Sequence, residues 1–188
     1  MVYDKLSFSF KKIDMTPSEE TMLSYPDETE YLKGKFRIDI TVQLNSKDIK
    51  WSHVDPYSLF IKSIDDIPNW DGSQSAYSSF LPFSCSCGDS GCAGIWDGIH
   101  VKSRKRTVEW RAKKTNGYSF LDKSFYSFEK TEYLLALKEL YKSIEVITEK
   151  YGDSFILDAG YSENSMTSGR EFLEYINEVV KPENQFWK

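Results

Sequence analysis

Three features of this 188-residue sequence predict an α+β fold, in which an antiparallel β-sheet meander carries two or three amphipathic helices packed on one face. Segments in which apolar and polar residues alternate dominate the first two thirds of the chain, and the longest helical pattern comes late. Such alternation is typical of a sheet with one buried face, because strands buried on both faces read as continuous apolar runs. Strands first and main helices last favour the α+β class. The length predicts a single globular domain over residues 1–188.

The clearest strand is FRIDITVQL, residues Phe36 to Leu44, in which every second residue is apolar. LSFSF at Leu6 to Phe10 alternates in the same way. The stretch between them contains Pro17, Pro26 and five carboxylates, and it predicts an acidic loop or a short hairpin.

Two further strands are predicted by AGIWDGIHVKS and RTVEWRAKK, joined by a short turn near Arg104 and Lys105, with YSFLDKSFYSF continuing in extended form. The main basic concentration of the chain lies here, interleaved with Trp110. Its members are Lys102, Arg104, Lys105, Arg106, Arg111, Lys113 and Lys114. Cations beside an indole are typical of a single-strand nucleic-acid groove. We favour the alternative, the solvated tip and outer face of a β-hairpin, where lysines discourage edge pairing.

Three helices are predicted from apolar spacing and end signals. DPYSLFIKSIDDIP predicts a helix over residues 55–66 that Pro68 follows. TEYLLALKELYKSIEVITEKYG predicts the longest helix, which ends at Gly152. Its expected apolar stripe is Leu134, Leu137, Leu140, Tyr141, Ile144, Ile147 and Tyr151. SGREFLEYINEVVKP predicts a last helix with Phe172, Leu173, Ile176 and Val180 facing inward.

All three cysteines lie in FSCSCGDSGCAGIWDGIH, where Cys85, Cys87, Cys92 and His100 give the spacing C-x-C-x4-C-x7-H. Three thiolates and an imidazole are ligands that tetrahedral Zn²⁺ prefers, so a zinc-binding structural module is one hypothesis. Structural zinc sites usually carry two ligand pairs of the C-x2-C or C-x4-C kind. This segment does not contain two such pairs. The alternative, which we favour, is that GDSG forms a hairpin loop and the cysteines pack as small apolar residues.

Candidates for catalysis are few. His53, in WSHVDP, could be oriented by Asp55 as a base for Ser52, which would make the chain a small enzyme, or it could fill a turn. No P-loop, GxGxxG, HExxH or GxSxG motif occurs in the sequence. We therefore expect neither an enzyme nor a cofactor.

The charge distribution predicts a protein partner. The net charge is −5, and residues 129–188 hold 12 acidic against 7 basic groups, which disfavours nucleic acid and would steer a basic protein to the C-terminal part. The expected partner-binding residues are Glu19, Glu20, Asp27, Glu28 and Tyr31 in the acidic loop, and Glu171, Glu174 and Glu178 in the last helix. No secretory signal or long apolar run is evident, so we expect no membrane partner and a cytoplasmic location.

The segment FLPFSCSCGDSGCAGIWDGIHVKSRKRTVEWR, about Phe80 to Arg111, resembles a motif of small acidic bacterial proteins. Some of these resemble immunity proteins of contact-dependent or polymorphic toxin systems. The resemblance implies a cytosolic antidote that binds a cognate toxin and blocks its active site, with no catalysis of its own. The acidic charge suits a basic, nuclease-type toxin, and the plentiful aromatic residues suit a protein interface.

Overall fold

The structure is a computed structural model that describes residues 3–14, 33–49, 53–54, 78–80, 83–84, 98–113, 118, 120–158 and 167–179. The strands are β1 (Leu6–Asp14), β2 (Phe36–Leu44), β3 (Lys47–Asp48), β4 (His53–Val54), β5 (Ser78–Phe80), β6 (Phe83–Ser84), β7 (Ile99–Ser103), β8 (Thr107–Arg111), β9 (Phe125–Glu129), β10 (Phe155–Asp158) and β11 (Thr167–Ser168). The helices are α4 (Lys130–Tyr151), the short 3-10 helix η2 (Gly152–Ser154) and α5 (Gly169–Val179).

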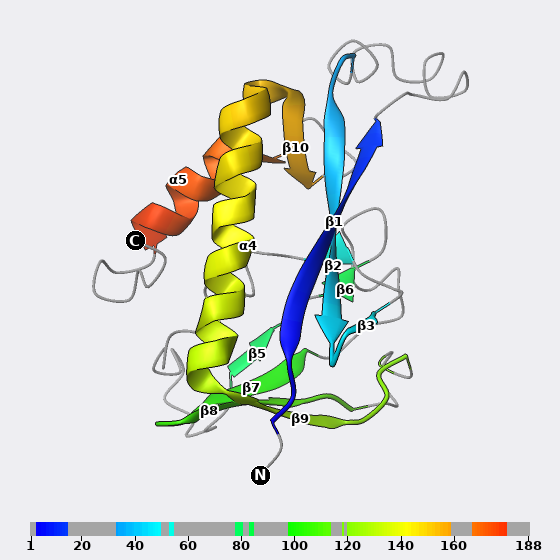
Figure 1. The fold of residues 1–188 in the computed structure, drawn as a ribbon, viewed down its shortest axis with the longest axis vertical. Helices are drawn as coiled ribbons and strands as arrows, with labels where there is room; N and C mark the ends of the chain where they lie inside the picture. Colours follow the sequence, from blue (N-terminus) through cyan, green and yellow to red (C-terminus); the bar gives the residue numbers. More distant parts are fainter. Residues whose placement is uncertain are drawn as a thin grey trace.

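The first sheet contains β1, β2, β3, β10 and β11 (Figure 1). β1 and β2 pair antiparallel along their whole length, from Leu6 opposite Leu44 to Asp14 opposite Phe36. β10 joins the other edge of β2 in parallel, and β11 pairs antiparallel with β10. The five apolar residues of β2 that alternate in sequence are all buried, as the period-two pattern predicts.

The second sheet is antiparallel, in the order β5-β7-β8-β9, and its last three strands form a meander. In Figure 1 these strands cross the molecule below β1 and β2, which follow its long axis. The two sheets meet where Asp4, just before β1, bridges Phe128 of β9. Beyond that bridge β1 turns away with β2, as expected for strongly twisted strands. β4 and β6 form a separate two-stranded ladder.

The long helix α4 connects the two sheets. Its first turn is capped by the Glu129 carboxylate, which accepts a hydrogen bond from the backbone N–H of Glu132 at 2.9 Å. Hydrogen bonding to the ionised form outweighs partial burial and holds the pKa of Glu129 below its ordinary value. The helix ends at Gly152, whose φ of 54° is in the left-handed region that glycine tolerates best. The predicted end of this helix is therefore confirmed.

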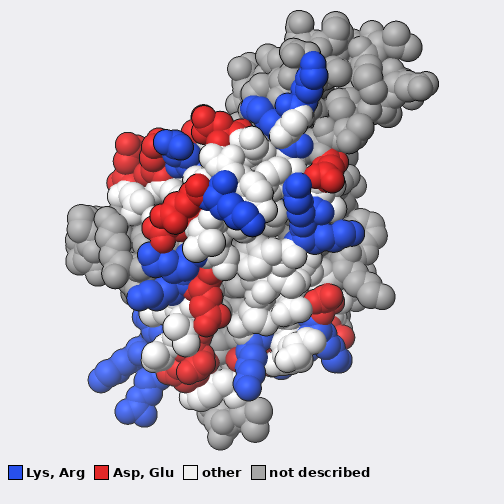
Figure 2. Space-filling view, turned by 45° about the horizontal axis from the view of Figure 1, so that its top comes forward, with Lys and Arg blue, Asp and Glu red and all other residues white. Residues whose placement is uncertain are grey.

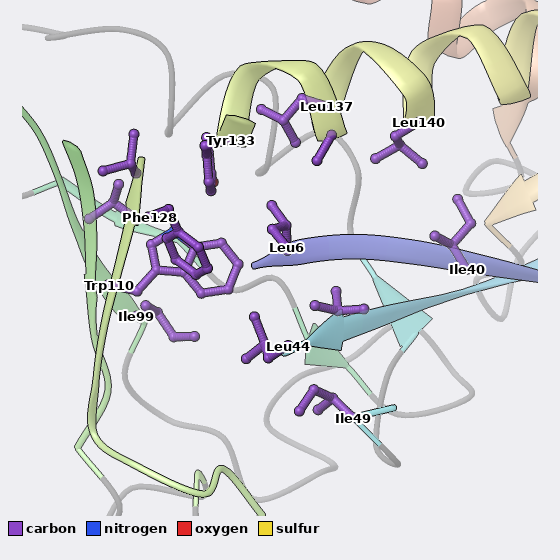
Figure 3. Close-up of a cluster of buried hydrophobic side chains, with 14 of the residues drawn as sticks. Leu6, Ile40, Leu44, Ile49, Ile99, Trp110, Phe128, Tyr133, Leu137 and Leu140 are labelled. Carbon is purple, nitrogen blue, oxygen red and sulfur yellow. The ribbon is translucent and has the colours of Figure 1, made fainter. Parts of the chain in front are cut away.

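The core fills the space enclosed by the two sheets and α4 (Figure 3). Leu6 of β1 points toward Tyr133 and Leu137 of α4, while Trp110 and Phe128 approach from the second sheet. The Trp110 ring meets that of Phe128 edge to face, with centroids 5.0 Å apart. Such pairs stabilise a core by about 1 kcal/mol beyond the burial of their area.

The predicted α+β class is confirmed. The strands divide between separate sheets instead of forming one meander, and the pair β2–β10 is parallel. In α4, the predicted stripe residues Leu137, Leu140, Tyr141 and Ile144 are buried. Tyr133 is also buried, whereas Tyr151 is 37% exposed. The helix expected at residues 55–66 lies outside the described residues. None of the helices in the described ranges has the length and apolarity needed to cross a bilayer.

Candidate functional site

The last helix, α5, carries an acidic exposed face. Glu171, Glu174 and Glu178, the three predicted partner-binding residues of this helix, are all exposed. Tyr175, which is 43% exposed, shares their face because positions i, i+3, i+4 and i+7 of a helix lie on one side. We call these four residues the α5 face. Figure 2 shows acidic side chains gathered at its upper left, the side on which α5 lies in Figure 1.

Local sequence explains why α5 begins where it does. Ser168 and Glu171 form a reciprocal capping box: the Ser168 hydroxyl accepts from the Glu171 N–H at 3.2 Å, and the Glu171 carboxylate accepts from the Ser168 N–H at 2.8 Å. Gly169 follows directly and packs closely against Thr148 of α4. Glu171 therefore has a structural role in addition to its charge.

The inner side of α5 fixes the direction of its exposed face. Phe172 and Ile176 are fully buried against α4 and β10. The Asn177 side chain donates to the Tyr141 hydroxyl at 2.9 Å and to the Leu173 carbonyl at 2.8 Å. A face held in this way would lose little conformational entropy when a partner binds.

The side chains of the α5 face are suited to contact positively charged groups. Three carboxylates around a half-exposed phenol ring provide acceptors for Lys and Arg and a rigid aromatic surface. The positively charged side chain of Arg170 lies at one end of this face. Its Nε is 3.7 Å from a carboxylate oxygen of Asp153, and both side chains are largely exposed. An exposed pair of this kind contributes little to stability and leaves the face acidic.

The other predicted partner-binding residues, Glu19, Glu20, Asp27, Glu28 and Tyr31, lie outside the described residues. Tyr175 is the one member of the α5 face that was not among the predicted partner-binding residues. Its spacing from Glu171 and Glu178, four and three residues, is the signal that would have found it.

The zinc hypothesis is not tested by the described part of the chain. His100 lies on β7, between the buried residues Ile99 and Val101, in a row with Ser79 and Arg111 of the neighbouring strands. Cys85, Cys87 and Cys92 lie outside the described residues, and the described residues contain no group of three or more metal-ligating side chains. His53 lies on β4 opposite Ser84, while Ser52 and Asp55 are not described.

The described residues of the basic concentration, Lys102 to Lys113, lie on or next to the hairpin of β7 and β8, and they do not form a stacking groove with Trp110. Trp110 is only 1% exposed and faces the core, so its indole is not available to a base. The strands turn near Arg104 and Lys105 as predicted, and the Arg104 N–H donates to the Thr107 carbonyl at 2.7 Å. The Arg104 guanidinium also pairs with Glu109 at 2.6 Å. Lys114 lies outside the described residues.

Comparisons of this chain with protein-family models, with curated proteins and with solved structures found no match.

Proposed function

We propose that this protein is a cytoplasmic immunity protein that binds a cognate basic, nuclease-type toxin and covers its active site, with no catalysis of its own. The observation that carries this proposal is the α5 face, where three exposed carboxylates surround Tyr175 on a helix held by buried residues. The resemblance of residues 80–111 to immunity proteins supports the same function.

Charge favours a basic partner over an acidic one. The chain has a net charge of −5, and its last 60 residues contain more acidic than basic groups. Carboxylates on an exposed helix accelerate the encounter with a positively charged protein, and salt at 0.1 M screens that attraction at separations beyond about 10 Å. A nuclease binds phosphate through basic residues around its active site. An acidic helix could therefore compete with the nucleic acid for that surface.

Reversing two charges of the α5 face tests the proposal. The probe is the C-terminal domain of the large secreted protein expected to be encoded immediately upstream. In the double variant Glu174→Lys, Glu178→Lys we expect association to slow by about tenfold or more at low salt and to depend less on salt. Stopped-flow or surface plasmon resonance kinetics at two salt concentrations measure both effects. Glu171 stays unchanged because it caps the helix.

The matched control reverses two exposed carboxylates outside α5: Glu132, in the first turn of α4, and Asp122, in the turn before β9, where it forms an exposed pair with Lys47. It changes the net charge by the same amount, so its association rate should remain close to that of the unmodified chain. Equal slowing in both variants would show that only net charge matters and would reject the α5 face. If the unmodified chain neither binds the domain nor protects cells that express it, the proposed function is wrong.

Removing the aromatic side chain tests a different part of the same face. We expect Tyr175→Ala to raise the dissociation rate by about tenfold and to leave association nearly unchanged, because aromatic contacts form after encounter. Tyr175→Phe, which keeps the ring, should retain most of the affinity. Dissociation rates that are unchanged in Tyr175→Ala would place the ring outside the interface.

A further inference from the structure

β1 is an edge strand with an outward-facing row of backbone groups. The Asn45 N–H donates to the Lys5 carbonyl at 2.9 Å, so Lys5 directs its main-chain groups toward β2. In an antiparallel pair this direction alternates, so the even-numbered residues of β1 direct theirs away from β2. Asp4 agrees, because its N–H donates outward to the Ser127 carbonyl of β9 at 2.8 Å. After Asp4, no described strand pairs with this edge.

An open apolar groove lies beside this edge. Its volume is about 640 Å³, and it is lined by Phe10 of β1 and by Glu139, Lys142, Ser143, Val146 and Ile147 of α4. Phe10 is 37% exposed and Val146 is 60% exposed. Figure 2 shows uncharged surface at the centre of the molecule, with basic side chains to its right. Exposed apolar surface next to an unpaired strand edge is a typical site for addition of another strand.

We propose that a second copy of this chain occupies the edge, with β1 of each copy pairing antiparallel about a two-fold axis at Phe10. Phe10 is the middle residue of Leu6–Asp14, so this register matches the outward groups of one copy with those of the other along the strand. Each Phe10 then lies opposite Phe10 of the other copy, and Val146 of α4 is covered.

Charge favours this arrangement. In the same register Lys12 lies opposite Phe8 of the partner copy, and no two lysines face each other directly. Even-numbered side chains of β1 share the face toward α4, where Glu139 lines the groove. Lys12, whose ammonium is 3.1 Å from Asp14 in the single chain, can therefore turn toward Glu139 of the other copy, and the two-fold axis produces this contact twice.

The dimer leaves the α5 face accessible, so this inference is independent of the proposed function. α5 contacts α4 at Tyr141, through Asn177. Five residues at 3.6 residues per turn put Val146 about 140° around the helix from Tyr141. The groove and α5 therefore lie on different sides of α4.

The oligomeric state of the full chain tests the proposal. Sedimentation equilibrium or light scattering on a gel-filtration column should give twice the chain mass of 21.9 kDa at high protein concentration. Phe10→Pro removes one outward N–H without breaking a bond to β2, and Val146→Asp charges an exposed side chain. We expect each to raise the dimer dissociation constant by at least about tenfold. The control Phe125→Asp, on a side chain 43% exposed in β9, should not change it.

A charge exchange tests the register. Lys12→Glu and Glu139→Lys should each weaken the dimer, and the double variant should recover part of the loss because the pair is restored with reversed signs. Hydrogen exchange of the Phe8 and Phe10 amides should slow as the concentration rises. A monomer at every concentration would overturn the proposal. A dimer that persists unchanged in both Phe10→Pro and Val146→Asp would overturn it as well.

Discussion

Replacing Gly169 by alanine is expected to lower the free energy of unfolding by about 2 kcal/mol, although alanine is the better helix former by about 1 kcal/mol. A Cβ at this position would be 2.2 Å from Oγ1 of Thr148 and 2.6 Å from two ring carbons of Phe155. Both neighbours are buried, and the Phe155 ring is fully enclosed. α5 would have to move away from α4 and β10. Urea unfolding followed by circular dichroism measures the loss.

A double-mutant cycle tests whether the contact with Thr148 causes the loss of stability in Gly169→Ala. Among the described residues, Oγ1 of Thr148 has no hydrogen-bond partner, so Thr148→Ala removes a crowding atom without breaking a hydrogen bond. We therefore expect Gly169→Ala to cost less in the Thr148→Ala background by about 1 kcal/mol. If the cost of Gly169→Ala is the same in both backgrounds, the contact with Thr148 is not the source.

Local patterns predicted the elements whose burial is decided along one segment. Phe36 to Leu44 alternates strictly, and β2 has those bounds because one face is covered by the core. The end of α4 at Gly152 was predictable because a left-handed backbone favours glycine. In both cases the information is carried by neighbouring residues.

Pairings between distant segments were not predictable from local pattern. β10 lies parallel to β2 across more than a hundred residues, after the crossover that includes α4. Tyr133 is buried although it was not assigned to the apolar stripe, because Trp110 and Phe128 of the second sheet cover it. These contacts depend on how the two sheets cross, and a periodicity within one segment contains no such information.

The candidate site shows the same division. The helical spacing of Glu171, Glu174 and Glu178 placed them on one exposed face of α5, and the described structure agrees. The groove beside Phe10 had no sequence signal, because Phe10 continues the alternation of the buried Leu6. Phe10 is exposed because β1 diverges from α4 along its length (Figure 1), and this divergence is a property of the assembled fold.

Asp4 is expected to contribute about 2 kcal/mol to stability near neutral pH, because its carboxylate connects three segments. It accepts from the Asn45 side chain at 2.8 Å and from the Ser127 N–H at 2.9 Å, and it pairs with Lys123. Its side chain is only 11% exposed. Asp4→Asn should remove this contribution, since the amide has one acceptor oxygen and no charge. Asp14→Asn, on a carboxylate 76% exposed in the same strand, should cost under about 0.5 kcal/mol.

The contribution of Asp4 should depend on pH in one direction. Burial raises the pKa of Asp4, but hydrogen bonds from Lys123, Asn45 and Ser127 outweigh burial and hold that pKa below its ordinary value. A carboxyl whose pKa is lower in the folded than in the unfolded chain stabilises fully above the unfolded value, about 3.9, and loses this effect as pH falls through the folded value. The stability difference between the unmodified chain and Asp4→Asn should therefore be largest near pH 7 and shrink below about pH 4. Urea unfolding of both proteins at several pH values measures that difference, and a difference that stays constant down to pH 2 would contradict the lowered pKa.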